Sequence, residues 1–189
     1  MFVRPLHQFS SSYYCFDFPV GTSAITAITT QTGDDTVFIS SEANENITTA
    51  RTVDVLLGWL DYIEQDLFVN VTTGRHRLLM SDEKSIYAKG SQTVPAVLTS
   101  QSLTNLLDTL GDIYFYTSGT GNWSAGVDLW LGEGGDRLDV QSVPSNPGST
   151  YHGTYTSVHA GYGDDNLTIS LDAAYHNGGK YHTELLFGY

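Results

Sequence analysis

The sequence predicts an all-β domain built from stacked strand–turn–strand repeats, and three observations lead to this prediction. A phrase in which Asp follows Gly by two positions recurs along the chain. Apolar and polar residues alternate on both sides of each phrase, which is the period of a strand with one buried face. The chain has 189 residues, 40% of them hydrophobic, which is enough for one core.

The strand after each turn keeps a fixed distance from the Gly. Counted from Gly33, Gly134 and Gly163, an Asp stands at +2 and apolar residues stand at +4 and +6. We expect these apolar residues to point inward together: Val37, Ile39, Leu138, Val140, Leu167 and Ile169. A degraded copy at Gly74 keeps Leu78 and Met80 but has His76 in place of Asp.

The strand before each turn repeats as well, at −7, −5 and −3 from the Gly. The positions are occupied by Leu67, Val69 and Val71, by Val127, Leu129 and Leu131, by Thr156, Val158 and Ala160, and more weakly by Thr26, Ile28 and Thr30. The alternation then predicts outward side chains at Thr36, Phe38, Phe68, Asn70, Asp128, Trp130, Asn166 and Thr168. Exposed aromatic residues among them, Phe38, Phe68 and Trp130, suit carbohydrate stacking or contact with another subunit.

Each Gly-x-Asp turn has a structural explanation that needs no ligand. Gly adopts positive φ without steric cost, as a sharp bend between strands often requires. The Asp beside it can accept hydrogen bonds from nearby backbone N–H groups.

The remaining segments are less defined. Residues 53–67 fit a helical stripe or two short strands around Gly58, and residues 102–110 are similarly ambiguous. Residues 142–153 form a loop by their Pro, Gly, Ser and Asn content. We expect an N-terminal strand or extension over residues 1–23 and a single domain over residues 24–189.

The phrases "GEGGDRLDV" and "GYGDDNLTI" resemble the repeats-in-toxin nonapeptide G-G-x-G-x-D-x-U-x, in which U is a large apolar residue. The wider pattern is similar to that of long repetitive surface proteins. This resemblance implies a parallel β-solenoid, of the β-helix or β-roll kind. It also implies an extracellular or cell-surface protein with a structural or adhesive role.

The resemblance makes calcium a candidate ligand. The carboxylates that could bind it are Asp34, Asp35, Asp136, Asp164 and Asp165. The chain departs from the toxin pattern because its turns stand far apart in sequence. One turn offers fewer oxygens than the six to eight that calcium takes. No other cofactor is expected.

Charge limits the partners. The formal net charge is −13, so the surface repels a phosphate backbone and no nucleic-acid partner is expected. The sequence has no run of about 20 apolar residues, so no membrane span is expected. Four N-x-Ser/Thr sequons, at Asn46, Asn70, Asn122 and Asn166, are candidate glycosylation sites on a secreted chain. Cell-surface glycans are candidate partners.

These observations favour a non-enzymatic extracellular structural protein, a module or subunit of a filament, sheath or adhesin. We expect a homo-oligomer or filament that assembles through strand edges, around Tyr13–Phe18 and Tyr181–Tyr189. One alternative is a β-helical polysaccharide lyase or hydrolase. Adjacent carboxylates such as Asp34 and Asp35 point to opposite faces of a strand, however, and do not converge on one bond. A calcium-dependent adhesion module is the other alternative.

Overall fold

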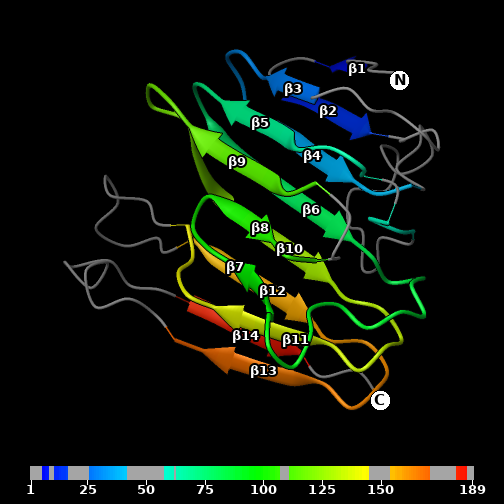
Figure 1. The fold of residues 1–189 in the computed structure, drawn as a ribbon. Helices are drawn as coiled ribbons and strands as arrows, with labels where there is room; N and C mark the ends of the chain where they lie inside the picture. Colours follow the sequence, from blue (N-terminus) through cyan, green and yellow to red (C-terminus); the bar gives the residue numbers. More distant parts are fainter. Residues whose placement is uncertain are drawn as a thin grey trace.

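The computed structural model describes residues 6–8, 11–16, 26–41, 58–61, 63–106, 111–144, 154–170 and 182–186. These residues form fourteen strands in two seven-stranded sheets, and no helix occurs among them (Figure 1). The prediction of a mostly β fold is confirmed.

The first sheet, sheet A, has the strand order β1-β2-β4-β6-β10-β12-β14. Its strands are β1 (Leu6–Gln8), β2 (Ser11–Phe16), β4 (Thr36–Ile39), β6 (Arg75–Ser81), β10 (Asn122–Trp130), β12 (Tyr155–His159) and β14 (His182–Leu186). The second, sheet B, has the order β13-β11-β7-β8-β9-β5-β3. Its strands are β3 (Thr26–Thr29), β5 (Leu67–Val71), β7 (Ala96–Leu98), β8 (Ser102–Thr104), β9 (Ile113–Thr117), β11 (Arg137–Val140) and β13 (Asn166–Ile169).

The repeat offsets found in the sequence are the pairing register of the strands. Residues at equal distances from their turn Gly lie directly opposite each other in parallel pairs. The pairs include Ile28 with Val69, Val37 with Leu78, Leu129 with Val158, and Leu138 with Leu167. The four units therefore stack in two pairs, one around Gly33 and Gly74 and the other around Gly134 and Gly163.

The prediction of a parallel β-solenoid is wrong, because both sheets are mixed. Antiparallel pairing joins β1 to β2 in sheet A, and β7 to β8 and β8 to β9 in sheet B. The cause in sheet B is a three-strand meander, β7-β8-β9, inserted between the second and third units. The meander bridges β5 and β11, whereas β6 pairs directly with β10 in sheet A.

The meander also exchanges the roles of the two sheets. In the first two units the strand before the turn lies in sheet B, as β3 and β5. In the last two units it lies in sheet A, as β10 and β12. The exchange arises because the meander adds a passage through sheet B between β6 and β10, so the third unit begins in sheet A.

The core consists of apolar side chains from both sheets. Four of the six residues expected to point inward are fully buried, namely Val37, Ile39, Leu138 and Val140. Leu167 is partly buried against this core, and Ile169 is 48% exposed. Both belong to β13, the outermost strand of sheet B, which has β11 on one side and no described strand on the other.

The outer face of sheet A departs from the expected exposure. Phe38, Asp128 and Trp130 were expected to face solvent, yet all three are buried. Leu79 is buried beside Phe38, its partner in the register. Phe38, Leu79 and Trp130 are not members of the core cluster, so sheet A buries apolar residues on both faces.

The structure resolves one ambiguous segment in part. Residues 102–104 form strand β8, while residues 107–110 lie outside the described residues. Residues 53–57, in the predicted stripe, also lie outside them; the described part, 58–61 and 63–66, is neither helix nor strand.

Candidate functional site

In each stacked pair, the turn of the second unit lies so close to the turn of the first that its Gly has no room for a side chain. Gly74 and Gly163 have φ of 124° and 127°, a region that favours Gly. A Cβ on Gly74 would lie 2.0 Å from the Gly33 carbonyl oxygen, and one on Gly163 would lie 2.2 Å from the Gly134 carbonyl oxygen. The repeated Gly is therefore explained by stacking of turn on turn.

The turn carboxylates bind the backbone of the neighbouring turn. Asp165 Oδ1 accepts a hydrogen bond from the Asp136 N–H at 2.9 Å. Asp136 Oδ1 accepts one from the Lys89 N–H at 2.7 Å. Asp34 Oδ1 accepts one from the Arg75 N–H at 2.8 Å. Asp165 and Asp34 thereby join stacked turns, and Asp136 joins its turn to the connection between β6 and β7.

His76 performs the same task in the degraded copy. Its Nδ1 accepts a hydrogen bond from the Asp35 N–H at 3.2 Å, as Asp165 accepts one from Asp136. Nδ1 must be unprotonated to accept, which fixes the neutral tautomer with hydrogen on Nε2. His76 is fully buried, and burial lowers its pKa, although the Asp35 and Asp34 carboxylates act in the opposite direction.

The candidate calcium ligands do not converge on one point. Asp34 and Asp35 belong to one stack of turns, and Asp136, Asp164 and Asp165 to the other. Asp35 and Asp136 are buried, whereas Asp34 and Asp164 are exposed. Across the part of the chain that the structure describes, no group of three His, Cys, Asp or Glu side chains could hold a metal ion. Calcium binding stays a prediction.

The candidate glycosylation sites differ in their placement. Asn166 is exposed on β13, and Asn70 on β5 and Asn122 on β10 are partly exposed. Asn46 lies outside the described residues. The exposed position of Asn166 agrees with the predicted outward face, and its modification stays a prediction.

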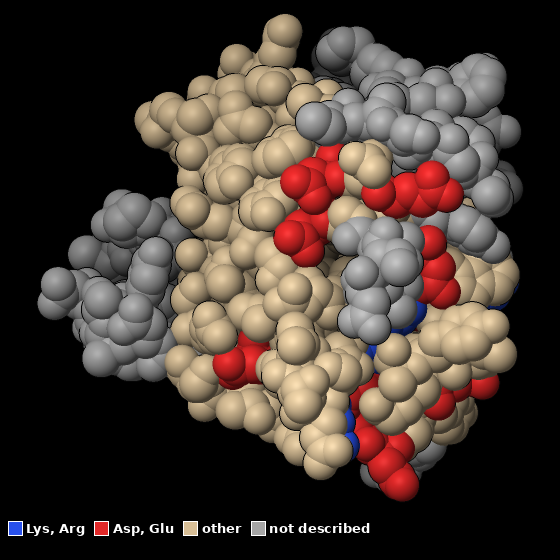
Figure 2. Space-filling model, in the orientation of Figure 1, with Lys and Arg blue, Asp and Glu red and all other residues tan. Residues whose placement is uncertain are grey.

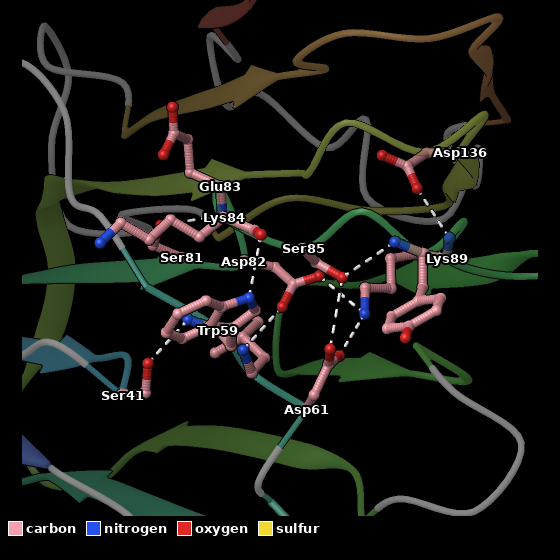
Figure 3. Close-up of polar contacts among 12 residues, drawn as sticks. Ser41, Trp59, Asp61, Ser81, Asp82, Glu83, Lys84, Ser85, Lys89 and Asp136 are labelled. Carbon is pink, nitrogen blue, oxygen red and sulfur yellow. Dashed lines mark hydrogen bonds and ion pairs between the residues drawn. The ribbon is translucent and has the colours of Figure 1, made fainter.

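A buried lysine lies at the centre of a polar cluster that the sequence did not predict (Figure 3). Lys89 is 1% exposed and belongs to the connection between β6 and β7. Its Nζ contacts Asp61 Oδ1 and lies 2.8 Å from Asp82 Oδ2. Asp82 directly follows β6 and is fully buried, while Asp61 precedes β5 and is 19% exposed.

Hydrogen bonds hold both carboxyl groups of this cluster in place. Asp82 Oδ1 accepts a hydrogen bond from the Leu60 N–H at 2.7 Å. Ser85 Oγ donates one to Asp61 Oδ2 at 3.3 Å. The connection before β5 is thereby fastened to the connection after β6.

Burial controls the protonation of the cluster. It raises the pKa of Asp82 to about 6, against the attraction of the Lys89 ammonium, and Asp61 raises it further. It also raises the pKa of Asp136 to about 7, with Asp165 and Asp82 adding to the effect. Asp82 and Asp136 therefore hold protons more readily than exposed carboxyl groups do.

The sequence offered little to reveal this cluster. Lys89, Asp61 and Asp82 occupy no position of the repeat, and a lone Lys is ordinarily exposed. The one usable signal is that basic residues are scarce, since the chain has 8 Lys and Arg against 21 Asp and Glu.

Several aromatic side chains stack on one another. Phe68 stacks on Tyr114 at a centroid distance of 5.0 Å, and Tyr114 stacks on Tyr116 at 6.0 Å. On sheet A, Trp130 stacks on His159 at 4.9 Å. The stacked faces of Phe68 and Tyr114 are occupied by each other, so they are not open for a sugar.

Comparison with family models, with curated protein sequences and with solved structures finds no match. None of the described residues forms a helix long and apolar enough to cross a membrane.

Proposed function

We propose that this chain is a non-enzymatic structural protein of an extracellular assembly: a module or subunit of a filament, sheath or adhesin. In this proposal copies associate through the edges of their sheets. The single observation that carries it is the exposed edge strand β13.

Strand β13 combines two features of an edge that can accept another chain. Its backbone pairs with β11 on one side, and among the described residues no strand covers the other side. Ile169 on this strand is 48% exposed, although its counterpart Val140 is fully buried. An unpaired backbone edge with an exposed apolar side chain is a template for strand pairing.

Each sheet has one outermost strand at either end of the molecule, and this arrangement suits end-to-end association. Strands β13 and β14 are outermost at one end, and β1 and β3 at the other (Figure 1). Contact between unlike ends generates an open chain of subunits when the rotation does not close. The expected contact through Tyr13–Phe18 is revised here, because β2 lies between β1 and β4 and is not an edge.

The described polar cluster gives the enzymatic alternative little support. A polysaccharide enzyme needs an acid and a base that reach solvent and substrate. Lys89 and Asp82 are 1% and 0% exposed. Their burial suits a structural role better than contact with a polymer.

The test is light scattering on the purified chain and on two variants, with and without calcium and over a range of salt concentrations. Ile169→Lys places a charge on the β13 edge and should abolish association. Ile86→Lys is the matched control, because Ile86 is also exposed, at 66%, but lies in the connection between β6 and β7. Monodisperse monomer for the unsubstituted chain under every condition, or equal association of both variants, would refute the proposal.

A further inference from the structure

The side chains of Lys89, which is 1% exposed, and Asp61, which is 19% exposed, are in direct contact (Figure 3). A third group, the Asp82 carboxyl, reaches the same nitrogen, since Asp82 Oδ2 lies 2.8 Å from Lys89 Nζ. Apart from this contact with Lys89, no hydrogen bond reaches Asp82 Oδ2 from the described residues. One amine therefore meets one carboxyl group to react with and another to exchange protons with.

An ion pair between Lys89 and Asp61 is energetically costly in a largely buried position. A buried ammonium and carboxylate lose their hydration, and their mutual attraction does not always offset that loss. Burial, with a smaller effect of the Asp61 charge, raises the pKa of Asp82 to about 6 against the attraction of the Lys89 ammonium, so Asp82 can accept a proton from Lys89 and return it. Condensation of amine and carboxyl to a neutral amide would remove both charges from the interior.

We propose that Lys89 and Asp61 are joined by an amide bond between Nζ and Cγ, and that Asp82 transfers the protons in its formation. The Nζ lone pair attacks Cγ of Asp61 after Nζ gives a proton to Asp82. The C–N bond forms, and the C–O bond to one Asp61 oxygen breaks. That oxygen leaves as water, taking the proton held by Asp82 and a second from the nitrogen.

The reaction balances within the protein. An ammonium and a carboxylate give one secondary amide and one water molecule, with no change in oxidation state and no other reactant. Holding amine and carboxyl in contact replaces a collision between separate molecules, which is a large source of rate in intramolecular reactions. A neighbouring carboxyl group that both accepts and donates a proton is a general acid–base catalyst.

The cross-link would strengthen a defined part of the fold. It would close a covalent loop containing β5 and β6, one strand from each sheet. The two strands could then separate only as far as this loop allows. A covalent tie across a loop restricts the unfolded chain, as a disulfide does. The inference stands on the Lys89 contacts and does not depend on assembly through β13.

The experiment is mass spectrometry of the intact, folded full chain, followed by sequencing of its proteolytic peptides. We expect a mass one water molecule below that of the sequence, no tryptic cleavage after Lys89, and a branched peptide joining Lys89 to Asp61. The mass is measured on the unsubstituted protein as isolated, so no unfolding and refolding step is needed.

Variants assign the roles of the groups. Lys89→Arg and Asp61→Ala should restore the full mass of their sequences, whereas the control Lys84→Arg should keep the loss of water. Asp82→Ala should leave Lys89 and Asp61 unjoined in a chain that still melts cooperatively. A folded unsubstituted chain at full mass, or a water loss mapped to other residues, overturns the cross-link, and a cross-link that persists in Asp82→Ala overturns the role of Asp82.

Discussion

A side-chain acceptor two residues after the turn glycine ties neighbouring turns together. Asp165 and His76 occupy this position in the second unit of each stacked pair, and both accept the backbone N–H of the equivalent residue in the first unit. A carboxylate and an imidazole nitrogen have little in common except the lone pair that they present. The position therefore requires an acceptor of suitable length and does not require a charge.

Asp136 makes this requirement testable by pH. Its folded-state pKa, about 7, is above the ordinary value of 3.8, so between these values the folded chain holds a proton that the unfolded chain releases. The contribution to stability is complete below about pH 3.8 and is lost as pH rises through 7. Asp136→Asn keeps an oxygen acceptor for the Lys89 N–H and removes the titration.

We therefore predict that the unsubstituted chain loses stability relative to Asp136→Asn as pH rises from 4 to 7, and that the difference is constant above pH 7. Urea unfolding of both proteins at a series of pH values measures it. His76 titrates in the opposite direction in both proteins, so its effect cancels in the comparison. Asp82 titrates in the same direction as Asp136, and the interaction of the two carboxyl groups is part of the measured difference. Parallel pH profiles for the two proteins would contradict the assignment.

At the scale of strands and turns, the sequence predicted register better than topology. Offsets from Gly33, Gly74, Gly134 and Gly163 placed the right residues opposite one another, because stacked units repeat the same steric and hydrogen-bonding needs. The meander β7-β8-β9 could not be predicted in this way. Its strands are three to five residues long, and short apolar runs do not reveal direction or sheet.

The polar cluster was equally hidden from the sequence. Lys89, Asp61 and Asp82 meet because two connections, separated in the chain by β5 and β6, come together in space. No local pattern records such a meeting. The buried outer face of sheet A was missed for a related reason, since alternation predicts which side chains share a face and not whether that face is covered.

The adjacent aspartates of the last turn provide a matched pair for testing the turn-to-turn bonds. Asp165 accepts the Asp136 N–H, whereas Asp164 is exposed. Asp165→Ala should lower the free energy of unfolding by about 1–3 kcal/mol, because it leaves a backbone donor without its charged acceptor. Asp164→Ala should change it by no more than about 0.5 kcal/mol, as is usual at an exposed position.

Denaturant unfolding measures the free energy of unfolding of the two single variants and of the unsubstituted chain. Equal effects at both positions would mean that the pair acts through its charge alone. The comparison should be made with and without calcium, because a calcium ion bound by these carboxylates would make both substitutions costly only in its presence.

At the scale of the whole molecule, two features act against each other in association. The net charge of −13 makes copies repel one another, and acidic side chains appear in several groups on the face shown in Figure 2. Among the described strands, those outermost at both ends have an edge that favours addition of a further chain. Because repulsion between exposed charges is screened by salt, association through the edges should strengthen as ionic strength rises.

The central claim is that this protein works by assembling end to end. The measurement that tests it most directly is electron microscopy of the protein isolated from its native source. The account predicts filaments or regular arrays in which β13 and β14 of one copy lie beside β1 and β3 of the next. Separate single particles in native material, at high salt and in the presence of calcium alike, would contradict it.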